Sequence, residues 1–110
     1  MNTYLLRWKL KDDTFKRLIA KPVNRREYAK QLIESFGGLM QTYHFVVGDF
    51  DGCSISTFPS PTAMFACQMR ALSTGAFERF EANLLISPEE AEEAMYQAGR
   101  TEVDYRALNV

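Results

Sequence analysis

Apolar and polar side chains alternate along residues 3–10, TYLLRWKL. One parity of this segment holds Tyr4, Leu6, Trp8 and Leu10. A period of two residues is typical of a β-strand that buries one face. We therefore predict a half-buried strand here. Similar short segments, bounded by glycine or proline, predict further strands at residues 39–47, 53–58 and 77–86.

Between these strands the apolar residues follow helical spacing instead. After Asn24 an apolar face recurs at Tyr28, Ala29, Leu32, Ile33 and Phe36, before Gly37-Gly38. Asn24 is the predicted N-cap and Glu27 its capping-box partner. A shorter helix is predicted after Asp12 or Asp13, ending near Pro22.

Two further helices begin with a serine followed directly by proline. Ser60 and Pro61 precede the first, which Gly75 ends. Ser87 is the predicted cap of the second, with Glu90 at the capping-box position and Gly99 as its stop.

The resulting order is strand, helix, strand, strand, helix, strand and one extra helix. This is the ferredoxin-like βαββαβ pattern, an α+β fold with a four-stranded antiparallel sheet and two helices on one face. We predict a single domain at residues 1–99, followed by a polar C-terminal tail or arm at residues 100–110.

Strand parity divides the predicted sheet into two faces. The helix-covered face is predicted to carry Leu6, Trp8, Tyr43, Phe45, Val47, Cys53, Ile55, Phe80, Ala82 and Leu84. The second face is predicted to carry Leu5, Arg7, Lys9, Met40, Thr42, His44, Val46, Ser54, Ser56, Phe58, Arg79, Glu81, Asn83 and Leu85. This mixture predicts a face that a second subunit covers in a homodimer or a higher homo-oligomer, with a wet cavity for a small ligand as the alternative.

Composition and charge narrow the classes of partner that this protein is predicted to bind. A net charge of −1 with no basic cluster indicates no nucleic-acid binding. The short apolar runs predict no membrane span, and an N-terminus that is charged by Arg7 predicts a cytoplasmic protein without a signal peptide. Cys53 and Cys67 make neither a disulfide framework nor a zinc site, although they could be neighbours above the core face. We predict no metal and no cofactor.

The segment VVGDFDGC joins the second and third predicted strands. We interpret it mainly as hairpin chemistry, in which Gly48 and Gly52 permit positive φ and Asp49 or Asp51 accepts from nearby backbone amides. It lacks the third acid and the final glutamate of a calcium loop. The functional alternative places Asp51 at the end of the cavity between subunits. A large loss of stability in Asp51→Ala would favour the hairpin.

This turn also carries a resemblance. Gly48, Phe50 and Asp51 resemble the Gly-x-Tyr-Asp signature of the GYD domain family, with phenylalanine where the family has tyrosine. The resemblance covers about residues 3–97 and implies a dimeric α+β barrel in which two ferredoxin-like sheets pack face to face. The family has no established common activity, so the resemblance implies fold and assembly. Phe50 offers no phenol for any role of that hydroxyl.

The predicted second face supplies the candidate site. His44 is the single histidine and the candidate proton shuttle, with a hydrogen-bonded interface histidine as the alternative. The candidate ligand-binding residues are Arg7, His44, Ser54, Ser56, Arg79, Glu81 and Asn83.

Three functions follow from these observations. The first is a homo-oligomeric small-ligand-binding or interaction protein. The second is a cofactor-independent enzyme, resembling monooxygenases or isomerases, that acts on a small organic molecule in the barrel cavity. The third is a regulatory or assembly subunit that uses the last helix and the tail. The absence of a strong catalytic constellation favours the first.

Overall fold

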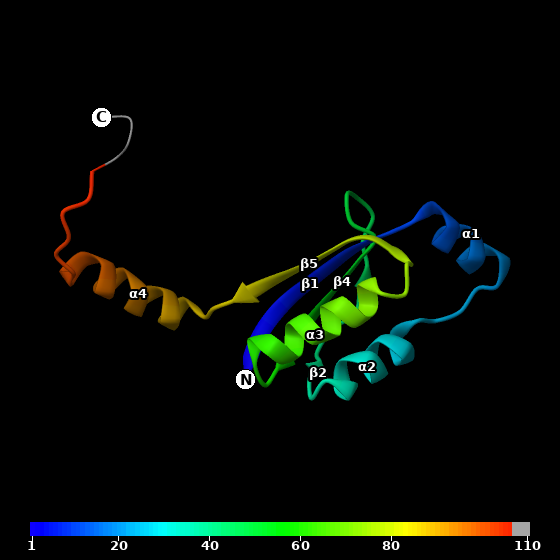
Figure 1. The fold of residues 1–110 in the computed structure, drawn as a ribbon, viewed down its shortest axis with the longest axis horizontal. Coiled ribbons are helices and arrows are strands. Elements are labelled where there is room, and N and C mark those ends of the chain that lie inside the picture. Colours follow the sequence, from blue (N-terminus) through cyan, green and yellow to red (C-terminus); the bar gives the residue numbers. More distant parts are fainter. Residues whose placement is uncertain (107–110) are drawn as a thin grey trace.

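The computed structural model describes residues 1–106. Figure 1 shows its elements, and their bounds are β1 (Asn2–Leu10), α1 (Asp12–Ala20), α2 (Arg26–Ser35), β2 (Leu39–Met40), β3 (His44–Phe45), β4 (Gly52–Phe58), α3 (Pro61–Leu72), β5 (Phe77–Leu85) and α4 (Pro88–Arg100). The predicted tail extends into residues 107–110, which lie outside the described part.

All strand pairs are antiparallel, and the sheet order is β2-β4-β1-β5, with β3 also paired to β4. The α+β class and the antiparallel sheet predicted from the sequence are therefore confirmed. The strand predicted at residues 39–47 is split into β2 and β3. Between them, the amides of Gln41 and Thr42 both donate to the Ile55 carbonyl, so two residues oppose one. This bulge reverses the strand's parity, so the second-face position predicted for Met40 is wrong. Met40 lies on the helix-covered face and packs against the core.

The face assignment predicted for β4 is wrong. Residues paired across an antiparallel ladder share a face, and Ser54 pairs with the buried Leu6 while Ser56 pairs with Tyr4. Ser54, Ser56 and Phe58 therefore lie on the helix-covered face, and Cys53 and Ile55 lie on the opposite, open face.

Apolar character favoured Cys53 and Ile55 as core residues, but the core needs small side chains at this point. The two serines leave room beneath large β1 side chains and bond to each other, with 2.6 Å between their Oγ atoms. Each buried hydroxyl thus has a partner, which removes most of the cost of burying it. On β1 and β5 the predicted parity agrees with the ladders.

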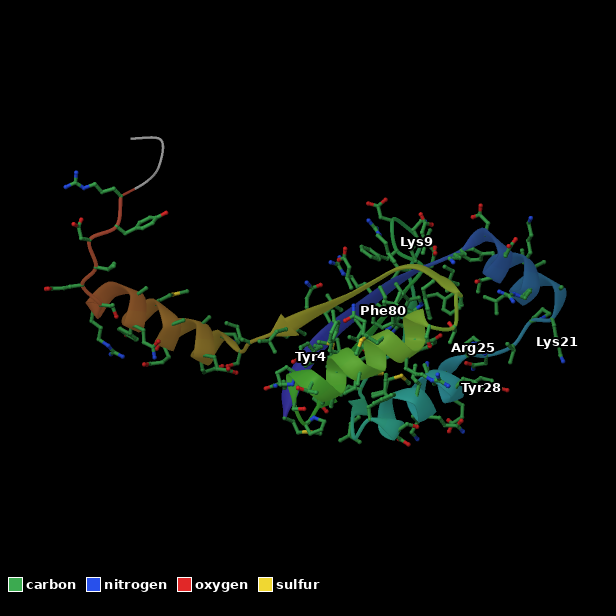
Figure 2. All side chains as sticks on the ribbon, viewed as in Figure 1. Tyr4, Lys9, Lys21, Arg25, Tyr28 and Phe80 are labelled. Carbon is green, nitrogen blue, oxygen red and sulfur yellow. The ribbon has the colours of Figure 1, made fainter. Side chains whose placement is uncertain are left out.

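Helices α2 and α3 lie along one face of the sheet (Figure 1). The buried core between these layers consists of Tyr4, Leu6, Trp8, Leu10, Ile33, Phe58, Cys67 and Ala71. No residue of α1 or α4 is buried. Helix α4 extends away from the end of β5, and its side chains have no other element around them (Figures 1 and 2).

The helix termini follow the predicted signals only in part. Ser60 caps α3, and Ser87 with Glu90 forms the complete capping box of α4, as predicted. At α2 the N-cap is Arg25 and not the predicted Asn24. The Asn24 side chain accepts from the Arg26 amide, whereas the predicted capping box requires the Glu27 amide. At α1 the N-cap is Lys11, which places both aspartates in the first turn. Gly99 does not stop α4, which continues to Arg100.

None of the helices in residues 1–106 combines the length and the apolar composition that a membrane crossing requires.

Candidate functional site

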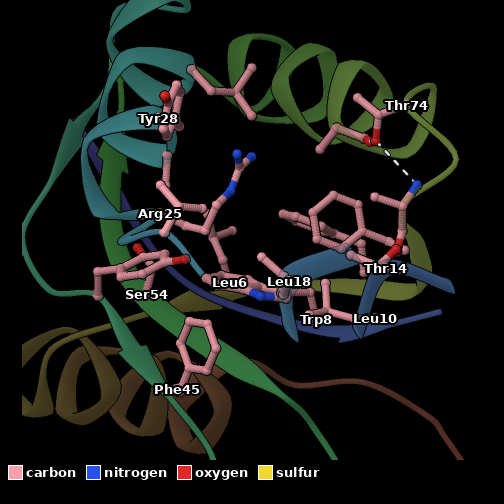
Figure 3. Close-up of a pocket in the computed structure, with 18 of the residues that line it drawn as sticks. Leu6, Trp8, Leu10, Thr14, Leu18, Arg25, Tyr28, Phe45, Ser54 and Thr74 are labelled. Atoms are coloured by element: carbon pink, nitrogen blue, oxygen red, sulfur yellow. Dashed lines mark hydrogen bonds between the residues drawn. The ribbon is translucent and has the colours of Figure 1, made fainter. Parts of the chain in front are cut away.

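A cavity lies between the helices and the helix-covered face of the sheet (Figure 3). Its volume is about 720 Å³, within the range of about 300–1,000 Å³ that is usual for small-molecule sites. The sequence predicted a ligand cavity on the other face, between two subunits. The chain itself therefore contains a cavity that the sequence did not predict.

Five aromatic rings form one continuous surface of this cavity, which we call the aromatic floor: Phe45, Tyr43, Trp8, Phe80 and Phe77. Trp8 stacks on both sides, with ring centroids 5.6 Å from Tyr43 and 6.0 Å from Phe80. Phe45 and Phe77 extend the row through edge contacts. Stacking at these distances favours fixed ring positions, so the floor is a preformed apolar surface.

Helices α1, α2 and α3 supply the opposite walls. Leu18 comes from α1, Ala29 and Leu32 from α2, and Cys67 and Ala71 from α3. These residues lie on the apolar faces of their helices, which is why amphipathic helices close over the sheet here. The walls are therefore apolar wherever they approach the floor.

A basic rim completes the cavity, and it consists of Arg17, Lys21 and Arg25. Arg25 lies beside Tyr28, with its guanidinium carbon 4.7 Å from that ring's centroid (Figure 3). Among residues 1–106 the lining contains no aspartate, glutamate or histidine. The cavity thus combines an apolar interior with one sign of charge at its edge.

Burial affects two titratable groups of the lining. Burial raises the pKa of the Cys67 thiol to about 11, so the thiol is protonated at neutral pH. Burial also raises the pKa of the Tyr43 phenol, against an opposing effect of Arg25 and Arg26. Tyr43 is accordingly a hydroxyl donor at neutral pH, and Cys67 is a poor nucleophile.

Most of the predicted site residues gather on the open face instead. Arg7 pairs with Glu81 at 3.0 Å and donates to Asn83 at 3.3 Å. Across the sheet, Arg7 pairs with Cys53, and Cys53 pairs with His44 on β3. His44 is exposed. Arg79 also lies on this face, whereas the candidates Ser54 and Ser56 do not.

The two cysteines lie on opposite sides of the sheet. Cys53 is on the open face, and Cys67 is on α3 above the other face. The expectation that they are neighbours is therefore wrong. The faces of β4 are the reverse of those predicted, which puts Cys53 on the open face and the two serines on the other.

Phe50, at the aromatic position of the predicted signature, contacts the open face. Its ring lies 4.4 Å from the guanidinium carbon of Arg7 and 4.8 Å from that of Arg79. A phenylalanine ring in contact with two guanidinium groups makes cation–π contacts that need no hydroxyl. The turn thus covers part of Arg7 and Arg79 on the open face.

Asp51 closes the end of a β-ladder. The β1–β4 pairing ends at Trp8 and Gly52, which leaves the Leu10 amide without a partner on β4. The Asp51 carboxylate accepts from that amide at 2.8 Å, and the Asp51 amide donates to the Trp8 carbonyl at 2.8 Å. These bonds give Asp51 a structural role, but its carboxylate accepts from β1 and not from the nearby amides that the hairpin interpretation predicted.

The glycines of this turn act differently from the prediction. In residues 1–106, positive φ occurs at Gly37 and Gly75, and neither Gly48 nor Gly52 adopts it. Gly52 is needed for space instead, since a Cβ there would collide with the indole of Trp8.

Asp51→Ala should lower the free energy of unfolding by about 1–3 kcal/mol, because it leaves the half-buried Leu10 amide unsatisfied. Urea denaturation followed by circular dichroism measures the change. Asp51→Asn retains an acceptor oxygen and should lose less. Asp49→Ala is the matched control from the exposed part of the turn. A loss in Asp51→Ala no larger than that of the control would contradict the role of this bond.

The fold and the turn together define a class of protein: a small α+β domain with an antiparallel sheet, an aromatic cavity under its helices and a Gly-Asp-Phe-Asp-Gly turn. The sequence model of the GYD domain matches residues 4–95. The chain therefore belongs to the GYD domain family. A comparison with curated proteins found no match.

Sequence reasoning missed the basic rim and the aromatic floor as a site. The available signal was the series of basic residues at Lys16, Arg17, Lys21, Arg25 and Arg26, interleaved with apolar helical positions. The floor comes from three separate segments, so no local pattern indicates that its rings meet.

Proposed function

We propose that this protein binds a small, largely apolar molecule in the cavity beneath its helices and works as a homo-oligomer of ferredoxin-like subunits. The observation that carries the proposal is the aromatic floor, which presents a preformed apolar surface within a cavity of ligand size. Empty apolar surface of this kind is costly in water, and a ligand that covers it gains the corresponding free energy.

Binding is favoured over acid–base catalysis by the chemistry of the lining. The residues 1–106 that line the cavity include neither a carboxylate nor an imidazole. The raised pKa values of Tyr43 and Cys67 keep both groups protonated at neutral pH. A general base would need a pKa near the working pH, which none of these groups provides.

The extended shape of the chain supports assembly. The radius of gyration is 18.0 Å, whereas a compact domain of this length has about 13 Å. The accessible surface is 8279 Å², against about 6,200 Å² for a compact monomer of 12.6 kDa. Both differences show that the chain exposes more surface than a compact monomer does, and part of that surface is apolar. The α4 side chain of Met95, for example, is 70% exposed.

The open sheet face is the surface that we propose for the dimer, as in a dimeric α+β barrel. Leu5 pairs with Ile55 at its centre, and Leu39 and Leu85 add apolar surface at the two edges. Arg7 Nε is buried without a hydrogen-bond partner in residues 1–106. A polar group from a second subunit would satisfy this donor, which an isolated chain leaves unsatisfied.

Titration with an apolar probe, combined with a substitution that fills the cavity, tests the binding proposal. Trp8 is the single tryptophan and part of the floor, so its fluorescence reports what enters. We expect the neutral probe 1-decanol to change this fluorescence in a saturable way. Ala29→Phe should weaken binding about tenfold or more, because the added ring occupies space that the probe needs.

Gln31→Phe provides the matched control for this experiment. It adds the same ring to the same helix at an exposed position outside the cavity, and it should bind as the native protein does. No saturable binding of 1-decanol, or equal binding by both variants, would contradict the proposed function.

A further inference from the structure

We propose that the cavity selects an amphipathic monoanion, an apolar body carrying one carboxylate, and that Arg25 binds the carboxylate. This inference rests on the proposed function of the cavity and adds the class of ligand. It starts from the asymmetry of charge in the lining, which holds three cationic side chains and, within residues 1–106, no acidic one.

The three rim cations are available to a ligand. The ion pairs in residues 1–106 involve Arg7, Lys16, Lys30, Arg100 and Arg106. Arg17, Lys21 and Arg25 take part in none of them. Since no carboxylate in residues 1–106 forms an ion pair with these charges, the rim attracts an anion, and the low-dielectric cavity beside it strengthens that attraction.

Arg25 is the rim residue placed for direct contact. It is the N-cap of α2, so the positive end of the helix dipole lies beside its side chain. Its guanidinium lies against the ring of Tyr28, which limits the orientations that it samples. In Figure 3 it lies between Tyr28 and the sheet residues Leu6 and Ser54. A planar guanidinium offers two parallel donors that match a carboxylate.

Tyr43 connects this anion site to the apolar floor. The charges of Arg25 and Arg26 both oppose the burial that raises the pKa of its phenol, and its ring stacks on Trp8. A protonated phenol donates a hydrogen bond, and a carboxylate accepts one. This arrangement sets the orientation of the ligand, with its charged head beside Arg25 and Tyr43 and its apolar body along Trp8 and Phe80.

The test compares three probes with the same ten-carbon chain: decanoate, 1-decanol and decylammonium, each titrated at pH 7.5 with Trp8 fluorescence as the readout. We expect decanoate to bind about tenfold more tightly than 1-decanol, the factor of one charge-assisted hydrogen-bond contact. Decylammonium should bind more weakly than 1-decanol, because the rim repels it.

Substitutions assign the effect to Arg25. Arg25→Gln should abolish the preference for decanoate over 1-decanol, because the carboxylate loses its guanidinium partner. Arg25→Lys keeps the charge but loses the paired donors, so it should retain a reduced preference. Arg26→Gln is the matched control for charge without contact, because the charge of Arg26 also acts on Tyr43 while its side chain does not line the cavity. Circular dichroism confirms that each exposed substitution leaves the fold intact.

The outcomes separate this inference from the proposed function. If 1-decanol binds but decanoate binds no more tightly, the anion inference is wrong and the cavity remains a binding site. If Arg25→Gln retains the preference, or Arg26→Gln loses it equally, the contact with Arg25 is wrong. If none of the three probes binds, the proposed function fails together with the inference.

Discussion

Gly52→Ala is expected to destabilise the protein by about 3 kcal/mol, the upper end for forcing extra volume into a packed core. Gly52 begins β4 opposite Trp8, and an added Cβ would overlap Nε1 and two carbons of the indole. The indole is held by Tyr43 on one side and Phe80 on the other. It cannot move away without breaking the aromatic floor.

Thermal and urea denaturation measure this loss, and the emission of the single tryptophan reports whether the indole has shifted. Gly48→Ala is the control, because a Cβ at that position meets nothing within 4 Å. It should change the free energy of unfolding by less than about 0.5 kcal/mol. Similar values for the two variants would show that Gly52 is not needed for space.

Ile55→Lys should convert the proposed dimer into a monomer. Ile55 lies on the open face beside Leu5, between the two edges of the sheet. In a face-to-face dimer the new ammonium would be buried without an acidic partner, at a cost of several kcal/mol, roughly. We therefore expect the dissociation constant to rise by about 100-fold or more.

Native mass spectrometry over a concentration series measures the subunit count directly. Gln31→Lys introduces the same charge on the exposed side of α2 and should leave the dimer intact. In an isolated chain Ile55 is only half-buried, so the Ile55→Lys variant should remain folded. A dimer that survives Ile55→Lys unchanged would exclude the open sheet face as the interface.

In the Gly-Asp-Phe-Asp-Gly turn, the sequence predicted the turn itself, and only the structure explains what its aspartate and its second glycine do. Its composition predicted a hairpin in which Asp49 or Asp51 accepts from nearby amides, but Asp51 accepts from the distant Leu10 amide at the end of the β1–β4 ladder. The reason for its second glycine was predicted wrongly. Backbone freedom is a local property that sequence suggests, whereas the approach of Trp8 is a contact between residues far apart in the chain.

The residues of the predicted site were likewise placed partly correctly and partly wrongly from the sequence. Parity on β1 and β5 correctly placed Arg7, Arg79, Glu81 and Asn83 together on the open face, because those strands are regular over this stretch. The same reasoning failed for Ser54 and Ser56. Their burial depends on the mutual hydrogen bond and on the size of the side chains above them.

The sequence by itself determined most of the elements, some of their ends, the α+β class and the family, because periodicity, capping and turn chemistry act between residues close in the chain. Only the tertiary structure decided the bulge at Gln41 and Thr42, the inward face of β4, the aromatic floor and the basic rim. These features depend on strand register and on the packing of distant segments. A one-residue change in pairing reverses a strand's faces without any change in its composition.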